Sequence, residues 1–173
     1  NLKGTYVNVV ITGSTKGIGL GLAREFLQRN HQVMVSSRGE EAVRVALATL
    51  AGIGSGKVAG CAADVTQPAD AKKLWDRAVA AFGGVDIWIN NAGMTNRKAP
   101  FANLPDEQIA MVIATNLNGV MNCCKVAIAG MLAQGRGTVF NMEGFGSDGL
   151  TDAGMSVYGT TKCAVRYFTK ALI

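Results

Sequence analysis

The chain has 173 residues, enough for one domain with a substantial core. Hydrophobic residues make up 49% of it and charged residues 17%, which is typical of a folded α/β domain and excludes a disordered chain. The net charge of +5 is scattered rather than gathered in basic runs, which argues against nucleic-acid binding, and no apolar run approaches the roughly 20 residues of a membrane span.

Segments with the pattern of strands and of helices alternate along the chain. The expected strands are 6–11, 32–37, 57–63, 86–90 and 137–142, and the expected helices are 17–30, 40–51, 68–82, 105–134 and 157 onward. In the first helix, Ile18, Leu22, Phe26 and Leu27 share the expected buried face. This alternation predicts a single Rossmann-like domain, a doubly wound parallel sheet with helices on both faces in three layers.

A glycine-rich segment joins the first expected strand to the first helix. Gly13 would allow a tight turn, Gly17 would let the backbone approach a pyrophosphate, and Gly19 would permit close helix packing. The spacing differs from the G-x-G-x-x-G fingerprint and from the loop of nucleoside triphosphatases, so a turn without a ligand is the alternative. Because a dinucleotide site lies between the first strand and helix, we assign to it Gly13, Ser14, Thr15, Lys16, Gly17, Ile18 and Gly19.

The end of the second strand indicates which dinucleotide is bound. NAD enzymes commonly carry a carboxylate here for the ribose 2′-hydroxyl, whereas this chain has Ser37 and Arg38, with Lys16 in the facing loop. A guanidinium can bind a 2′-phosphate through two hydrogen bonds, and a serine can donate another. The sequence therefore predicts NADPH; the alternative is that Arg38 is only a solvated residue at a helix start.

Four motifs in order resemble the short-chain dehydrogenase/reductase family across essentially the whole chain. They are the glycine loop, "NNAG" at 90–93, Asn116 in the long helix, and Tyr158-x-x-x-Lys162. The resemblance implies that Asp64 and Val65 lie beside the adenine. It also implies that the segment after the fourth strand borders the adenine ribose and stabilises the sheet, with Asn91, Ala92 and Gly93.

The resemblance implies catalytic roles as well. Tyr158 would be the general acid, Lys162 would hold the nicotinamide ribose, and Asn116 would distort its helix and hold a water of the proton relay. Tyr158 and Lys162 are one helical turn apart, so the lysine cation is placed to stabilise the phenolate.

The segment "FNMEGFGSDG" departs from the family pattern. The family usually shows Asn-x-Ser-Ser after the fifth strand, and the last serine polarises the substrate carbonyl. Here Glu143 and Gly144 take the two serine positions, and the nearest hydroxyl is that of Ser147. We expect Ser147 to fold back to the carbonyl; the alternative is that Tyr158 polarises it alone.

The same segment, with "ITGSTKGIG", "DIWINNAG" and "VYGTTKCAVRYF", is similar to the plastid chlorophyll b reductases. That resemblance implies NADPH-dependent reduction of the C7 formyl group of chlorophyll b to hydroxymethyl. It also implies a chloroplast location, peripheral association with thylakoids, and a homo-oligomer. Reduction of another ketone, sterol or acyl thioester, or a non-catalytic cofactor-binding module, are the alternatives.

Two further expectations concern the substrate side. Met94, Phe101, Phe145 and Met155 lie in loops near the expected mouth of an apolar cleft and would line it; the alternative is that they only pack within their loops. The chain stops at Ile173 within the helix of Tyr158 and Lys162, whereas family members continue with further strands and a substrate-covering helix pair. We therefore expect the C-terminal part of the fold to be missing. We expect no metal site, because the cysteines lack metal-ligand spacing.

Overall fold

The computed structural model describes residues 6–172. Residues 1–5 and 173 of the expected domain lie outside the described residues, and so does Ile173, where we expected the fold to be cut short. A parallel sheet of five strands runs in the order β3-β2-β1-β4-β5. The strands are β1 Asn8–Ile11, β2 Gln32–Ser37, β3 Val58–Ala62, β4 Ile87–Asn90 and β5 Thr138–Asn141. All five were predicted, and four of them are one or two residues shorter than expected because pairing ceases at their ends.

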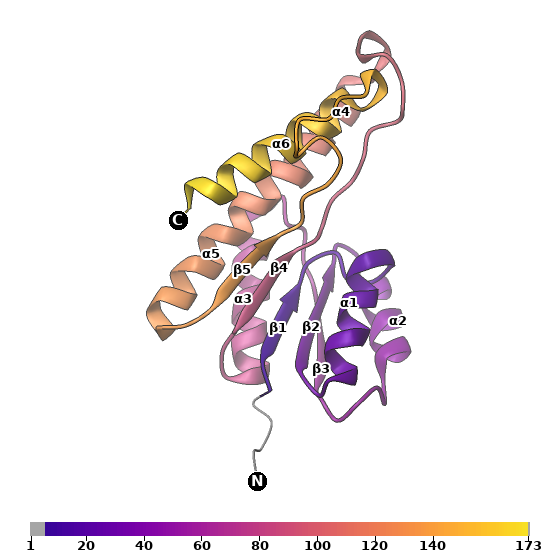
Figure 1. Ribbon diagram of the computed structural model, residues 1–173. Coiled ribbons are helices and arrows are strands. Elements are labelled where there is room, and N and C mark those ends of the chain that lie inside the picture. The colour runs from indigo at the N-terminus through magenta and orange to yellow at the C-terminus, as the bar shows by residue number, and fades with distance from the viewer. Residues whose placement is uncertain (1–5, 173) are drawn as a thin grey trace.

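Helices cover both faces of the sheet, which confirms the three-layer α/β prediction (Figure 1). On one face lie α1 Gly17–Gln28 and α2 Glu40–Leu50, and on the other lie α3 Pro68–Phe82, α5 Gly119–Gln134 and α6 Ser156–Ala171. Successive β1 residues alternate between the two cores: Val9 and Ile11 pack toward α1 and α2, and Val10 packs toward α3 and α5. All of β1 is buried, as expected of a central parallel strand.

The core on the α3 and α5 side contains both tryptophans of the chain. Trp75 of α3 and Trp88 of β4 stack with ring centroids 6.2 Å apart. Gly130 of α5 makes room for them, because a Cβ at this position would overlap the Trp75 indole. A side chain at residue 130 would therefore force α5 away from α3.

The buried face of α1 is narrower than predicted. Leu27 is fully buried and Leu22 and Phe26 pack against the core, but Ile18 is 68% exposed. Ile18 lies in the first turn, at the carboxyl end of the sheet, where no element covers it. The prediction for Ile18 was wrong because helical periodicity does not indicate where the covering layer ends.

The long helix predicted for 105–134 is present but is not uniform. It comprises α4 Asp106–Ile113, a π-helical turn at Ala114–Asn118, and α5. The helix is 29 residues long, and an 18-residue window of it reaches a mean hydropathy of 1.2. By length and composition it could therefore span a membrane, contrary to our expectation that no segment approaches this. Core helices of soluble proteins meet the same criterion, and this helix packs on α3, α6 and the sheet.

Figure 1 shows that α4 and α6 lie side by side and project past the carboxyl ends of the strands. The strand order reverses between β1 and β4, and such a switch point is where doubly wound sheets bind ligands. The fold therefore places the glycine loop, the segment after β4 and the start of α6 around one end of the sheet.

Candidate active site

A cleft of about 440 Å³ opens at the switch point. It is bordered by the segments that follow β1, β2, β3 and β4, all at the carboxyl end of the sheet. Most of the residues assigned to the dinucleotide line it. Ala63, Met94 and Thr115 line it as well, although none of them was assigned to the dinucleotide. The assigned residues that line it are Gly13, Thr15, Lys16, Gly17, Ile18, Ser37, Arg38, Asp64, Val65, Asn91, Ala92 and Gly93.

The three glycines of the loop serve two different purposes. Gly13 has φ +63°, and a Cβ there would lie 2.7 Å from the Cα of Ala92. Gly19 packs against Asn91 so closely that it also has no room for a side chain. Gly17, with φ +55°, faces open space at the first turn of α1, whose N–H groups no side chain caps. Gly17 therefore exposes backbone donors to a ligand, as an anion site requires.

Of the residues expected to contact the dinucleotide, Ser14, Gly19, Tyr158 and Lys162 do not line the cleft. The Ser14 hydroxyl is buried, donates to the Ile11 carbonyl at 2.6 Å and accepts the N–H of Ser36 at 2.8 Å. These hydrogen bonds join the loop to β2, so the Ser14 hydroxyl already has protein partners and does not face a ligand in the cleft. Thr12, which the sequence analysis missed, acts similarly: its hydroxyl accepts the N–H groups of Asn91 and Ala92 at 3.1 and 3.0 Å.

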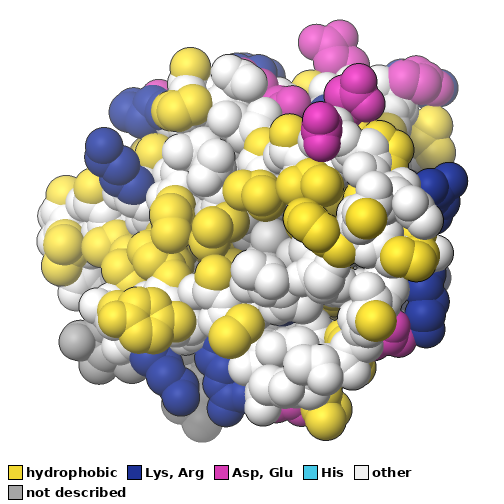
Figure 2. Space-filling view, turned by 90° about the horizontal axis from the view of Figure 1, so that it is seen from above, with side chains coloured by type: hydrophobic (Ala, Val, Ile, Leu, Met, Phe, Trp, Pro, Cys, Tyr) yellow, Lys and Arg dark blue, Asp and Glu magenta, His cyan; other side chains and the backbone are white. Residues whose placement is uncertain are grey.

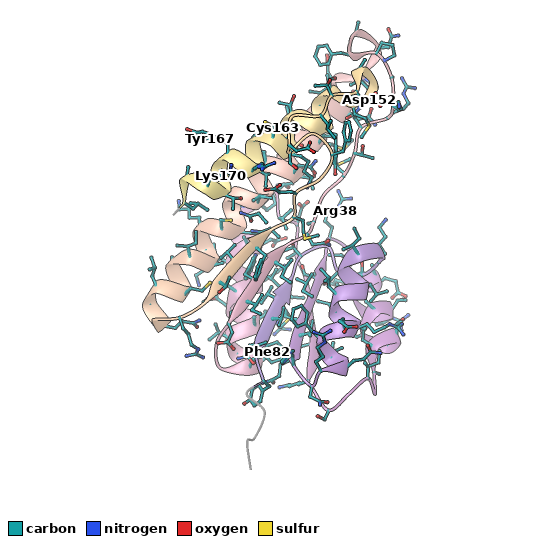
Figure 3. All side chains as sticks on the ribbon, in the orientation of Figure 1. Arg38, Phe82, Asp152, Cys163, Tyr167 and Lys170 are labelled. Atoms are coloured by element: carbon teal, nitrogen blue, oxygen red, sulfur yellow. The ribbon has the colours of Figure 1, made fainter. Side chains whose placement is uncertain are left out.

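The end of β2 carries positive charge and no carboxylate. Arg38 and Lys16 are both exposed, and neither forms an ion pair with any residue in the range 6–172. Figure 3 shows Arg38 at the carboxyl end of the sheet, below the projecting α6. The Asp64 carboxylate, which follows the neighbouring strand β3, accepts the N–H and hydroxyl of Thr66. An anionic group beside Arg38 would therefore meet two unpaired cations.

Tyr158 and Lys162 lie on the same face of α6 and point toward the ends of β4 and β5. The Lys162 ammonium lies 5.7 Å from the centre of the Tyr158 ring and donates a hydrogen bond to the Met142 carbonyl at 2.8 Å. Lys162 is only 6% exposed, and burial lowers the pKa of its ammonium. A Cβ on Gly93 would lie 3.9 Å from that ammonium, so the lysine adjoins the segment after β4.

Asn116 lies within the π-helical turn, so the expected distortion of its helix is present. Its fully buried side chain accepts the N–H of Met94 at 2.9 Å and donates to the Met94 carbonyl at 2.8 Å and to the Thr161 hydroxyl at 3.1 Å. Both amide hydrogens are thus used within the protein. A relay water at Asn116 would therefore bind its backbone carbonyl rather than its side chain.

A sequence model of the family described as short chain dehydrogenase matches residues 7–173. The chain belongs to the short chain dehydrogenase family. A relative from Arabidopsis thaliana, named "Chlorophyll(ide) b reductase NOL, chloroplastic", is 42% identical over 95% of this chain and 48% of its own. One from Oryza sativa subsp. japonica, "Probable chlorophyll(ide) b reductase NYC1, chloroplastic", is 41% identical over 96% of this chain and 36% of its own. The chain thus spans between a third and a half of these relatives.

Solved short chain dehydrogenases share the fold. The crystal structure of a variant of actinorhodin polyketide ketoreductase with NADPH is 34% identical and superposes with a TM-score of 0.88, over 96% of this chain and 64% of its own. That crystal structure contains NADPH. The cleft of this chain suits the phosphates of a nicotinamide dinucleotide, because the Gly17 backbone is open and two cations beside it are unpaired among the described residues.

Gly144 takes the position at which the sequence resemblance predicts the family's last serine, and the structure places this glycine directly against the phenol. A Cβ on Gly144 would overlap the Tyr158 hydroxyl. Among the described residues, Ser147 forms hydrogen bonds only through its backbone. Its N–H donates to the Gly144 carbonyl, and its carbonyl accepts a hydrogen bond from the Arg166 side chain at 3.1 Å. Gly144 therefore adjoins Tyr158, whereas no hydrogen bond joins Ser147 to Tyr158 among the described residues.

The four apolar residues expected at one mouth border three hollows, two of which adjoin at Ser156 and Thr160. Met94 borders the cofactor cleft, and Phe101 lies in a hollow of about 250 Å³ between α4 and α6. Phe145 and Met155 line a hollow of about 510 Å³ that also reaches Cys163. Figure 3 shows Cys163 on the outward side of α6. Since Cys163 is five residues beyond Tyr158, the two project from nearly opposite sides of the helix. The expectation of one shared mouth was wrong.

Hydrophobic side chains are nevertheless abundant at this end of the molecule. Figure 2, which looks down from above, shows them in a broad band, with acidic residues gathered near one edge. The structure also has large apolar side chains exposed along the projecting helices and the loop before α6: Met111, Ile113, Met121, Phe145, Leu150 and Tyr167.

Proposed function

We propose that the protein is an NADPH-dependent carbonyl reductase that reduces the C7 formyl group of chlorophyll b to hydroxymethyl. The observation that carries this proposal is the identity of about 40% to chlorophyll(ide) b reductases over nearly the whole chain, together with Tyr158 and Lys162 beside the cleft. The chain would hold the cofactor-binding half of the enzyme, since it spans less than half of those relatives.

Each residue of the site has a part in this reaction. The glycine loop and Arg38 would hold NADPH, which when bound would supply the hydride that the formyl carbon takes up. Tyr158 donates its phenolic proton to the carbonyl oxygen, so that the aldehyde gains one hydride and one proton and becomes an alcohol. The Lys162 cation stabilises the phenolate that remains, and Gly144 leaves the space in which the phenol lies. The protein contributes alignment and charge stabilisation.

The preference for NADPH over NADH rests on Arg38, Lys16 and Ser37 at the end of β2. Arg38→Ala should weaken NADPH binding about tenfold to a hundredfold, since a charge-assisted hydrogen bond contributes about 1.5 to 3 kcal/mol. NADH binding should hardly change. Calorimetric titration of both cofactors against both proteins measures this, and wild-type protein that binds NADH more tightly contradicts the proposal.

Location and assembly follow from the same relatives and from the surface. We place the protein in the chloroplast, because the names of both relatives include "chloroplastic". The exposed apolar residues of α5 and α6, such as Met121, Leu132 and Tyr167, suit a homo-oligomer or peripheral contact with thylakoids. Neither the charge nor its scatter suits nucleic acid.

The deciding experiment incubates the full-length protein with NADPH and detergent-solubilised chlorophyll b and separates the pigments by chromatography. We expect the 7-hydroxymethyl product from the wild type, and at least a hundredfold less from Tyr158→Phe, which keeps the ring but lacks the proton. Product formation that survives Tyr158→Phe undiminished would show that another group is the acid.

Reduction of a different carbonyl is the second candidate. It is favoured by the 34% identity to the actinorhodin polyketide ketoreductase and by a "Putative ketoacyl reductase" from Streptomyces coelicolor, 36% identical over 94% of this chain. A panel of simple ketones and acyl thioesters distinguishes the two. Turnover of these compounds without attack on chlorophyll b would establish the second candidate, and no turnover of any carbonyl would favour a non-catalytic module.

A further inference from the structure

The helix that carries Tyr158 lacks a cap from its own sequence. α6 begins at Ser156, and the preceding Met155 makes no side-chain capping hydrogen bond. The hydroxyl of Ser156 is buried and has no hydrogen-bond partner among the described residues. The first N–H groups of a helix have no partner within the helix, so a buried start needs acceptors from elsewhere.

Asn96, from the loop that follows β4, provides that acceptor. Its side-chain oxygen accepts the N–H of Tyr158 at 3.0 Å, across 62 residues of sequence. Tyr158 is the third residue of α6, which is where the side chain of a local capping residue would bind. The amide nitrogen of Asn96 donates to the Gly154 carbonyl at 3.0 Å and to the Arg97 carbonyl at 2.9 Å. Asn96 is only 3% exposed, so all of its side-chain hydrogen bonds are made within the protein.

The same loop also forms one wall of the cofactor cleft. Gly93 and Met94 line the cleft, and Asn116 binds both the N–H and the carbonyl of Met94. Asn116 in turn donates to Thr161 of α6. The loop is thus joined to α6 at two places, one through Asn116 and one directly through Asn96.

From this arrangement we infer that Asn96 is a positioning residue for Tyr158. It sets the first turn of α6, and hence the phenol, against the wall of the cofactor cleft. The backbone of Tyr158 is held by Asn96 at its N–H and by the Thr161 hydroxyl at its carbonyl, at 2.7 Å. A misplacement of reacting groups by about 1 Å lowers the reaction rate about a hundredfold. Loosening the first turn of α6 should therefore slow the chemical step. The inference rests on the proposed reductase function.

Three variants of the full-length protein test it. Asn96→Ala removes the acceptor and both donors. Asn96→Asp retains an acceptor for the Tyr158 N–H, and a negative charge suits a helix start. Lys98→Met is the matched control: Lys98 pairs with Asp152 at 2.7 Å and so joins the same two loops, but through an exposed ion pair that binds neither Tyr158 nor the cleft.

We expect Asn96→Ala to lower kcat at least tenfold and to change the KM for NADPH less than twofold. Asn96→Asp should restore most of kcat, and Lys98→Met should retain it. Amide hydrogen exchange over residues 156–162 should accelerate in Asn96→Ala alone. If Lys98→Met lowered kcat as much as Asn96→Ala does, the effect would be a general one of tying two loops together, and the inference would be wrong.

The exchange measurement needs no substrate, so it separates this inference from the proposed function. Suppose that the wild type reduced no pigment, but that amide hydrogen exchange at Tyr158 still accelerated in Asn96→Ala alone. The role of Asn96 as a helix cap would then be supported, and the proposed substrate would be wrong. Unchanged exchange in Asn96→Ala would overturn the inference, whatever the activity.

Discussion

Gly144 is the residue at which this site differs most from the usual pattern of its family. The space that a serine side chain would occupy is already taken by the Tyr158 hydroxyl. A serine at this position therefore cannot be added without moving the phenol. The carbonyl of the substrate would be polarised by Tyr158, without a second side-chain hydroxyl from residue 144.

This predicts an unusual outcome for the substitution that restores the family serine. Gly144→Ser should lower kcat about tenfold to a hundredfold, because its Cβ displaces the phenol, and Gly144→Ala should do the same. The melting temperature should change little, since the atom that must move is at the end of a side chain. Steady-state kinetics and thermal denaturation measure the two effects. A Gly144→Ser protein as active as the wild type would contradict this account.

Lys162 is a residue at which function and stability oppose each other. Burial lowers the pKa of its ammonium, and no carboxylate of the described residues pairs with it. The unfolded chain therefore holds this proton more tightly than the folded protein does. The charged lysine costs stability at pH values below its folded-state pKa, and the cost disappears as the pH rises from there toward the unfolded value.

Lys162→Met should accordingly unfold at a higher urea concentration than the wild type at pH 7, with a smaller difference at pH 10. Its reductase activity should fall by at least about a hundredfold. Lys125→Met, which removes an exposed lysine of α5, should change neither property. A Lys162→Met protein less stable than the wild type at pH 7 would mean that the lost hydrogen bond to Met142 outweighs the relief of charge burial.

At the scale of elements, buried amide side chains join β4 and β5 to the helices that cover them. Asn90 accepts the indole N–H of Trp88 at 2.8 Å and donates to Asn141 of β5 at 2.8 Å and to Cys124 of α5 at 3.2 Å. Asn141 donates to Thr169 of α6 at 2.9 Å. This network fixes α6 on the sheet at the end opposite its capped start.

Asn90→Ala should therefore destabilise the protein by about 2 to 3 kcal/mol, because it leaves the buried Trp88 indole N–H without a partner and removes the hydrogen bond to Asn141. Asn103→Ala, at an exposed position, is the control and should cost less than about 0.5 kcal/mol. Urea denaturation followed by circular dichroism gives both values. An equal effect of the two substitutions would show that the network contributes nothing specific.

The elements themselves were predictable because their signals are local. The glycine loop, the β-rich runs and the Tyr158–Lys162 spacing each lie within a few neighbouring residues, and each appears in the structure where expected. The ties that position them are not local. Thr12 binds Asn91 across 79 residues and Asn96 binds Tyr158 across 62, and no pattern in the sequence pairs such residues.

The surface was the least predictable part for a related reason. The exposure of Ile18 and the separation of Phe101 from Phe145 depend on which element covers which face, and this is decided only when the layers assemble. Ser147 was expected at the active site because it carries the hydroxyl nearest to the family's serine position, and its role there stays a prediction. That Gly144 lies against the Tyr158 hydroxyl could not be predicted, because the contact depends on how the loop folds onto α6.

At the scale of the whole molecule, the cofactor cleft and the catalytic pair lie at one end of the sheet, and the stacked tryptophans lie in the core behind it. Because Trp75 and Trp88 are the only tryptophans of the chain, its ultraviolet emission arises from a single buried position. Reduced nicotinamide absorbs light at the wavelengths that tryptophan emits. Binding of NADPH should therefore lower the fluorescence of the two tryptophans and raise that of the dinucleotide by resonance energy transfer. This gives a binding signal without any added label.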